Sequence, residues 1–438
     1  MVLAELLAPA GNLTKLKIAL DYGADAVYAG LGQFSLRNRA GKNFDLESFK
    51  EGVACTHAKG KKFYATLNGF PFNSQIKLLE EQLLKLADCG VDALIIATPG
   101  VLRLAQKLTP HIPIHLSTQA NVMNVLDAEV YYEMGVKRIV AAREMSLSDA
   151  IEIKKHLPDL EIEIFVHGSM CFAFSGRCLI SALQHGRVPN RGSCANDCRF
   201  DYEYYIKNPD TGVLMRLEEE EGIGTHILNA KDLNLANHIA AILDTKAIDA
   251  FKIEGRTKSS YYAAITTKTY RTAIDDYHNN QHRPALYQAE LATLKNRGFT
   301  EGYLIKRPHQ CLDTQNFQTA ISEGEFQVSG EVLEDGLHFL CKFTTRLNEP
   351  YEVVLPYGAH LEPVANELGK LYSFEGKDYL CLYKIALENG QELESIHSGN
   401  TNPVKLPAKL PPHTFLRQGS PSPVIQWLSL DYPQIFLS

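Results

Sequence analysis

The chain has 438 residues, 45% of them hydrophobic and 22% charged, which is an ordinary composition for a globular protein. This length exceeds the usual size of a single hydrophobic core, so two domains are expected. The formal net charge of -7 excludes a generally basic nucleic-acid-binding protein, and any site for a polyanion must be a local patch.

The N-terminal stretch, MVLAELLAPAGN, has no basic segment followed by a long apolar run. This argues against a signal peptide and against a membrane-spanning segment. We therefore expect a cytoplasmic protein with no membrane partner. In a reducing cytoplasm, nine cysteines are better suited to metal binding or catalysis than to a disulfide framework.

A helix, a glycine and a short apolar run recur along the first 255 residues. Gly23, Gly90 and Gly135 stand where the left-handed end of a helix favours glycine. The apolar runs after them are too uniform for a one-sided sheet and are typical of parallel strands buried on both faces. The predicted strands are 5–8, 26–29, 63–67, 93–97, 114–116, 138–142, 161–166 and 250–253.

Eight strands that alternate with helices predict an α/β fold, a (β/α)8 TIM-type barrel. A doubly wound open sheet is the alternative, but no G-x-G-x-x-G motif follows any of these strands. We assign residues 1–325 to a catalytic barrel domain in which residues 168–249, far longer than a usual connection, form a cysteine-bearing insertion. Residues 326–405 alternate in a β pattern and predict a small C-terminal all-β barrel or sandwich. The proline-rich tail, 406–438, is expected to wrap or link rather than pack.

Four of the nine cysteines cluster in the insertion, separated by six, fifteen and three residues. They are Cys171, Cys178, Cys194 and Cys198. By number, four thiolates satisfy either a tetrahedral Zn²⁺ ion or a [4Fe–4S] cluster. The loose spacing favours the cluster, because structural zinc usually uses tight C-x2-C pairs. The plain alternative is that these cysteines are small buried apolar residues.

Polar side chains follow most of the predicted strands, whose carboxyl ends meet at one face of a barrel. Such a mouth suits a polar, anionic small molecule, although any single side chain could instead cap a loop. As catalytic candidates we select His167, Glu254 and Arg256. As ligand-binding candidates we select Asn68, Gln119, Asn121, Arg143, Glu144, Arg177, Lys231, Asp232 and Lys258.

Basic residues alternate with aromatic residues in the insertion and after the eighth strand. The basic residues are Arg177, Arg187, Arg191, Arg199, Lys252, Arg256, Lys258 and Arg271. Arginine beside aromatic rings is typical of sites for unstacked bases of single-stranded RNA, whereas the alternative is a solvated face with core aromatics. The sequence has no H-E-x-x-H, G-x-S-x-G or phosphate-binding-loop motif, which argues against common hydrolase classes.

Several stretches resemble the collagenase-like peptidase family, and the resemblance covers nearly the whole chain. The stretches are ELLAPAGN (5–12), YGADAVYAG (22–30), IHLSTQAN (114–121), EIFVHGSMCFAFSGRCLIS (163–181), NRGSCANDCR (190–199) and KIEGRTKSSYYAA (252–264). Of these, the cysteine-bearing stretches are the most specific.

The resemblance implies prephenate-dependent, O₂-independent hydroxylation of the wobble uridine of tRNA at carbon 5, with an iron–sulfur cluster on the four clustered cysteines. The implied partners are the anticodon loop and prephenate, a small dicarboxylate. In this interpretation Arg143 and Arg256 hold the carboxylates, while His167 or Glu254 moves protons. The runner-up is a collagen-degrading peptidase that uses the cysteines for Zn²⁺. An RNA-binding scaffold and a ubiquinone-pathway hydroxylase are further alternatives.

Overall fold

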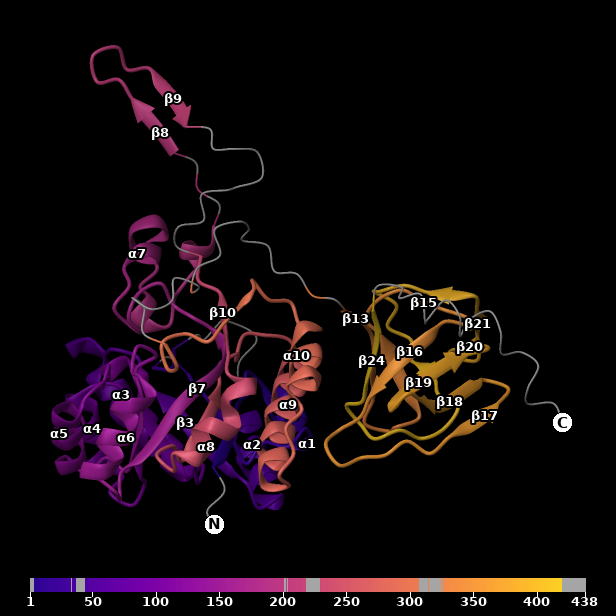
Figure 1. Cartoon of the computed structure of the whole chain (residues 1–438), viewed down its shortest axis with the longest axis horizontal. Coiled ribbons are helices and arrows are strands. Elements are labelled where there is room, and N and C mark those ends of the chain that lie inside the picture. The colour runs from indigo at the N-terminus through magenta and orange to yellow at the C-terminus, as the bar shows by residue number, and fades with distance from the viewer. Residues whose placement is uncertain are drawn as a thin grey trace. The chain divides into compact units, whose positions relative to one another are not determined.

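The computed structural model describes residues 4–32, 34–36, 44–200, 202, 204–217, 229–306, 314, 324 and 326–419. The chain divides into two compact units, which we describe separately (Figure 1). The first unit comprises Met1–Ala289 and Asn296–Glu323, and the second comprises Glu290–Lys295 and Gly324–Ser438. Residues 420–438 of the expected tail lie outside the described residues.

Eight parallel strands close into a barrel in the first unit. Neighbouring strands pair in the order β11–β1–β2–β3–β4–β5–β6–β7, and β7 pairs with β11 to complete the ring. The strands are β1 (Glu5–Pro9), β2 (Ala26–Ala29), β3 (Lys62–Leu67), β4 (Ala93–Ile96), β5 (Ile114–Leu116), β6 (Arg138–Val140), β7 (Glu161–Ser169) and β11 (Ala250–Ile253). The predicted TIM-type barrel is confirmed, and the open doubly wound sheet is excluded.

Helices follow the strands and surround the barrel (Figure 1). They are α1 (Leu13–Asp21), α2 (Leu46–Ala58), α3 (Ile76–Asp88), α4 (Pro99–Leu108), α5 (Val125–Glu133), α6 (Leu147–His156), α8 (Ile239–Asp244) and α9 (Ser260–His278). Gly23, Gly90 and Gly135 have positive φ angles of 103°, 77° and 86°, as the predicted helix ends require. No helix in the described parts of the chain combines the length and the apolar character needed to cross a membrane.

The strand β7 runs three residues beyond its predicted end, because the insertion returns to pair with it. β10 (Asp232–Asn234) lies antiparallel to this extension, and β12 (Phe299–Thr300) adds to β10 in parallel. The insertion also contains α7 (Ile180–His185), β8 (Tyr204–Lys207), β9 (Leu214–Leu217) and the short 3-10 helices η3 (Pro189–Arg191), η4 (Asp197–Arg199) and η5 (Ala236–His238). The helix α8, which lies inside the predicted insertion range, belongs to the regular strand–helix alternation of the barrel.

The second unit is built from antiparallel strands, as predicted. Its main sheet has the order β17–β18–β19–β16–β24–β13–β14–β23. These strands are β13 (Phe326–Val332), β14 (His338–Cys341), β16 (Pro350–Val354), β17 (Val364–Asn366), β18 (Gly369–Phe374), β19 (Lys377–Leu382), β23 (Val404–Lys405) and β24 (Phe415–Gly419). Two short pairs join β15 (Thr345–Arg346) to β22 (Ser395–Ile396) and β20 (Ile385–Ala386) to β21 (Glu392–Leu393).

The segment from Leu406 to Gly419 packs into this unit, so the expectation that the tail only wraps or links is wrong for these residues. Leu406 and Leu410 are buried in the hydrophobic core. The strand β24 lies inside the sheet between β13 and β16. The strand β24 was not predicted because the surrounding sequence is rich in proline and its partner strands lie far away in the sequence.

Buried charges hold the interior of the barrel together. The Glu163 side chain is fully buried, and its carboxylate lies 2.7 Å from the Lys252 ammonium and 3.2 Å from the Arg138 guanidinium. Arg138 also pairs with Glu5 at 2.7 Å. Burial lowers the pKa of Lys252, and the charge of Glu163 opposes that shift. Each of these charges therefore depends on the others for compensation.

We expect Glu163→Gln to lower the free energy of unfolding by about 3–5 kcal/mol, because it removes the carboxylate paired with buried Lys252 and one of the carboxylates paired with Arg138. Urea unfolding followed by circular dichroism measures this loss. Glu152→Gln is a matched control, since Glu152 is 53% exposed and pairs with Lys155 on the surface of α6. The control should lose less than about 1 kcal/mol. Equal losses in the two variants would show that the buried ion pairs do not stabilise the barrel.

Candidate active site at the barrel mouth

A cavity of about 140 Å³ lies at the carboxyl ends of the barrel strands, and residues 170–199, the cysteine-bearing segment, form its other wall. The barrel side includes Tyr28, Thr66, Asn68, Ser117, Gln119, Arg143, Phe165, Lys252 and Glu254. The other side includes Met170, Cys171, Phe172, Phe174, Ser175, Cys178, Cys194, Cys198 and Arg199. Barrel enzymes hold their substrates at this face, so the cavity is the candidate active site.

All four clustered cysteines line this one cavity. Burial raises the pKa of the Cys198 thiol, and charge on Cys171, Cys194 and Cys178 raises it further, which reflects their proximity. The described His, Cys, Asp and Glu side chains form no group of three or more that could hold a metal ion as they stand. The four thiols thus have the chemistry and the location required to bind a metal centre. Their sulfur atoms are not close enough together to form a metal site as they stand.

Two cations converge on the ring of Phe165 in the cavity wall. The Arg143 guanidinium carbon lies 4.0 Å from the ring centroid, and the Lys252 nitrogen lies 5.7 Å from it. Arg143 donates a hydrogen bond to the Ser175 hydroxyl at 2.6 Å, which joins the barrel to the cysteine-bearing segment. Its guanidinium lies 4.0 Å from the Glu254 carboxylate. Arg199 also lines the cavity, which therefore presents three positive groups and one carboxylate to a ligand.

Gln119 supplies an uncompensated donor in the cavity. The residue is 2% exposed, and its Oε1 accepts a hydrogen bond from the Ser117 hydroxyl at 3.1 Å. Its Nε2 has no hydrogen-bond partner among the described residues. A buried amide without a partner is costly, which points to a ligand with an acceptor at this position. Asn121 does not line the cavity but donates to the Gln119 carbonyl at 2.9 Å, so it helps to orient this turn.

Of the three catalytic candidates, only Glu254 lines the cavity, where it is 9% exposed. Arg256 donates to the hydroxyls of Ser35 at 2.7 Å and Thr66 at 2.9 Å, and to the carbonyl of Leu36. These contacts tie Arg256 to the loop after β2 and to β3, so its guanidinium is engaged by the protein and is not part of the cavity lining.

His167 is almost completely buried in an aromatic environment outside the cavity lining. The rings of Tyr262, Tyr270 and Phe299 lie 5.8, 5.6 and 5.7 Å from its own, centroid to centroid. Its Nδ1 lies 3.3 Å from the Tyr270 hydroxyl. Burial lowers the pKa of His167 to about 4, so the imidazole is neutral near pH 7.

The remaining candidates lie in several places. Asn68 and Arg143 line the cavity. Asp232 pairs with Arg297, which offsets burial and holds the pKa of that carboxyl below its ordinary value. Burial raises the pKa of Glu144. The candidates outside the cavity lining are Asn121, Glu144, Arg177, Lys231, Asp232 and Lys258.

Phe165 is not among the residues selected from the strand ends, and Lys252 was grouped with the residues for RNA contact. The structure instead buries Lys252 in the cavity wall. The sequence does hold a signal for the role of Lys252, since it is the single lysine in the apolar strand AFKI. A lysine is rarely buried without a partner, so its position in such a strand indicates a buried ion pair. Arg271, from the same basic set, is buried and pairs with Asp25 at 2.8 Å.

The fold and this cavity define a (β/α)8-barrel protein whose mouth is covered by a cysteine-bearing segment. Residues 11–314 match the model of peptidase family U32, and the chain belongs to this family. The resemblance to the collagenase-like peptidases is thereby confirmed.

Three relatives illustrate the range of names in this family. The chain is 70% identical to "tRNA hydroxylation protein P" of Helicobacter pylori strain J99, over 94% of this chain and 98% of the relative. It is 36% identical to a 23S rRNA 5-hydroxycytidine synthase of Escherichia coli, over 62% of this chain and 39% of the relative. It is 30% identical to "Collagenase" of Porphyromonas gingivalis, over 69% of this chain and 73% of the relative.

His167 makes a testable contribution to the pH dependence of stability. Because its folded pKa of about 4 lies below its ordinary 6.5, the unfolded state binds the proton first as the pH falls. The stability contributed by neutral His167 is therefore present above pH 6.5 and lost as the pH falls towards 4. A shift of this size corresponds to about 3 kcal/mol.

When the pH is lowered from about 6.5 to about 4, we expect the free energy of unfolding to fall less in His167→Phe than in the wild type. The difference between the two falls should be about 3 kcal/mol. Urea unfolding of both proteins at several pH values measures the difference, and other titrating groups cancel in the comparison. A difference between the proteins that does not change with pH would contradict the burial of a neutral imidazole.

Proposed function

We propose that this protein hydroxylates tRNA, with the mouth cavity as its active site. The observation that carries the proposal is the convergence of four cysteines, three cations and a buried amide without a partner on one cavity. The 70% identity to a protein named for tRNA hydroxylation supports the choice of substrate. We further propose that the product is 5-hydroxyuridine at the wobble position, since another relative is named for 5-hydroxycytidine synthesis.

The cysteine-bearing segment presents a surface suited to an RNA loop. Phe172 and Phe174 are exposed to solvent and also line the cavity, so a base stacked on them would reach the interior. Arg191 lies 4.2 Å above the ring of exposed Phe72 and donates to Gln75 at 3.3 Å. Arginine and exposed rings together hold phosphates and unstacked bases, which suits the anticodon loop.

The inner wall of the cavity suits the co-substrate that we propose, prephenate. Arg143 and Lys252 supply positive charge for a dicarboxylate, and Gln119 supplies a neutral donor. Arg256 then acts as a positioning residue for the loop that carries Ser35 and Leu36. Glu254 is the carboxylate placed to accept the proton that leaves the base, and it is better placed than His167 because it lines the cavity.

Hydroxylation replaces a carbon–hydrogen bond by a carbon–oxygen bond and is a two-electron oxidation of the base. We propose that Cys171, Cys178, Cys194 and Cys198 hold a [4Fe–4S] cluster, and that the co-substrate in the cavity, in place of O₂, donates the oxygen atom and takes up the two electrons. Such a cluster supplies one-electron transfer when bound, whereas Zn²⁺ on the same thiolates has no redox chemistry.

Peptidase activity is the second candidate function, because a relative 30% identical to this chain is named "Collagenase". The described lining of the cavity contains no histidine that could activate one of its cysteines or serines as a nucleophile. This observation favours the hydroxylase over a cysteine or serine peptidase.

The function can be tested in a strain that lacks this protein, by mass spectrometry of nucleosides from its tRNA. We expect the wild-type chain to restore 5-hydroxyuridine and Arg143→Ala to restore it about 10-fold to 100-fold less well, the cost of a lost charged hydrogen bond. Arg103→Ala, on the exposed side of α4, is the matched control and should behave as the wild type. If the wild type restores no 5-hydroxyuridine, the proposed function is wrong. If Arg143→Ala restores it fully, the carboxylate site is wrong.

The cluster can be tested by anaerobic purification with metal analysis and a visible spectrum. We expect about four irons per chain and a broad visible absorption band, both lost in Cys194→Ala. Cys89→Ala is the matched control, because Cys89 is a half-buried cysteine outside the cavity lining. One zinc and no iron in the wild type would contradict the cluster and revive the peptidase candidate.

A further inference from the structure

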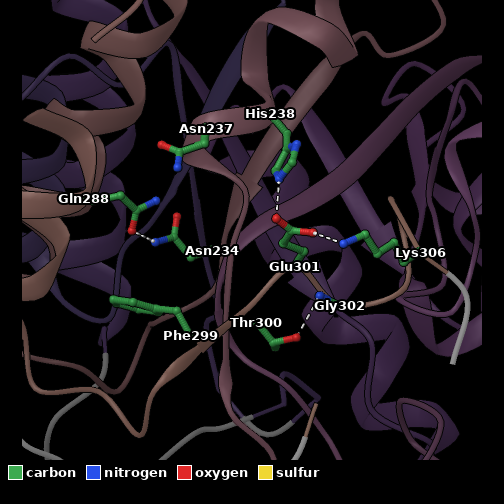
Figure 2. A pocket seen from close by; sticks show the side chains of 9 residues that line it. All are labelled: Asn234, Asn237, His238, Gln288, Phe299, Thr300, Glu301, Gly302 and Lys306. Atoms are coloured by element: carbon green, nitrogen blue, oxygen red, sulfur yellow. Dashed lines mark hydrogen bonds and ion pairs between the residues drawn. The ribbon is translucent and has the colours of Figure 1, made fainter. Parts of the chain in front are cut away.

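A second pocket, of about 320 Å³, lies outside the barrel mouth in the first unit (Figure 2). It shares no lining residue with the mouth cavity. Its walls come from β10, η5, β12 and the segment that follows β12, together with α10 (Pro284–Ala292). The lining residues are Asn234, Asn237, His238, Gln288, Phe299, Thr300, Glu301, Gly302 and Lys306.

Three carboxamides and one aromatic ring gather on one side of this pocket (Figure 2). Asn234 is 6% exposed, accepts from the Tyr270 hydroxyl at 3.3 Å and donates to the Gln288 Oε1 at 3.0 Å. These bonds fix the Gln288 amide by its oxygen, and its nitrogen, which has no hydrogen-bond partner in the part of the chain that the structure describes, can donate to a ligand. Asn237 is exposed at the same rim. A carboxamide offers donors and acceptors together, so this wall can pair with a ligand edge that carries both.

The other side of the pocket is electrically balanced. The imidazole of His238 lies 2.8 Å from the Glu301 carboxylate, which lies 4.0 Å from the Lys306 ammonium (Figure 2). Because the Glu301 carboxylate already has His238 and Lys306 as partners, the lining suits an uncharged polar ligand better than an isolated phosphate or carboxylate.

We infer that this pocket binds a nucleobase of the RNA substrate, at a nucleotide other than the one that is hydroxylated. The inference rests on the proposed function, because it takes the ligand to be part of the tRNA. A base has a planar face for Phe299 and an edge of alternating donors and acceptors for Asn237 and Gln288. Stacking combined with amide hydrogen bonds is how proteins hold bases splayed out of single-stranded RNA, and the volume falls within the range of small-ligand sites.

The second pocket is connected to the mouth cavity through contacts in the structure. Phe299 packs on the ring of His167 with centroids 5.7 Å apart. The His167 carbonyl accepts a hydrogen bond from the backbone nitrogen of Glu254 at 2.9 Å. A base stacked on Phe299 would therefore steady the strand ends that carry Glu254, the proposed proton acceptor. Binding of a second base would then increase both the affinity for the RNA loop and the specificity for its sequence.

The test measures the dissociation constant of unmodified tRNA by filter binding at fixed salt, together with hydroxylation of the same tRNA. We expect Asn237→Ala combined with Gln288→Ala to bind about tenfold more weakly, and Phe299→Leu to show a similar loss. Phe299→Tyr keeps the ring and should restore binding. Gln281→Ala, an exposed glutamine outside both cavities, is the matched control and should bind as the wild type.

The outcomes separate the two proposals. If the wild type hydroxylates tRNA and the pocket variants bind it as tightly as the wild type, the nucleobase site is wrong and the function stands. If the wild type neither binds nor hydroxylates tRNA, the proposed function is wrong. Asn237→Ala alone changes an exposed side chain, so its weakened binding would support the site even if Phe299→Leu failed to fold.

Discussion

The fully buried carboxylate of Glu163 is the constraint on which the barrel interior and its mouth depend. It lies between Arg138, which reaches towards Glu5, and Lys252, which lines the cavity. The free energy needed to remove Glu163, Arg138 and Lys252 from water exceeds the attraction of any one pair among them. The three buried charges are therefore stable only together. Lys252 can offer a positive charge at the floor of the cavity because Glu163 compensates for its burial. The charge that the mouth offers to a ligand therefore depends on Glu163, a buried residue that does not line the cavity.

Sequence patterns predicted the barrel well because its strands have a local signature. Strands buried on both faces read as uniform apolar runs, and the helix-terminal glycines mark where each run begins. Interactions across long sequence separations left no such signature. The extension of β7 requires Gly168, where an added Cβ would lie 2.4 Å from the carbonyl of Glu254. It also requires pairing with β10, more than sixty residues later. The strand β24 was hidden for the same reason, because its partners lie far away in the chain and proline dominates its surroundings.

The residues of the candidate site could be predicted only where side chains alternate regularly between the two faces of a strand. Asn68, Gln119, Arg143 and Glu254 follow strand ends and line one cavity. His167 also stands at a strand end, but the pairing of β7 with β11 shifts register, so that Phe165 pairs with Lys252 and His167 with Ile253. A shift of one residue turns a side chain to the opposite face of a sheet, which places His167 among the aromatic rings outside the cavity. A bulge of this kind arises from the pairing itself and cannot be read from the residues of either strand.

The cysteine-bearing segment has little regular structure to hold it over the mouth, since its only α-helix, among the described residues, is the six-residue α7. Its contacts with the barrel include two hydrogen bonds. Arg143 donates to Ser175, and Phe70 donates its backbone N–H to the Asn190 carbonyl at 3.2 Å. A centre bound by the four cysteines would cross-link this segment at the cavity that it closes, so occupancy of the centre and formation of the substrate site would be linked. The rings of Phe172 and Phe174, which this segment leaves exposed, are the ones on which we propose that a base stacks. If the proposed centre orders this cover and RNA is the substrate, a cover with little regular structure would reconcile a rigid charged floor with a macromolecular ligand.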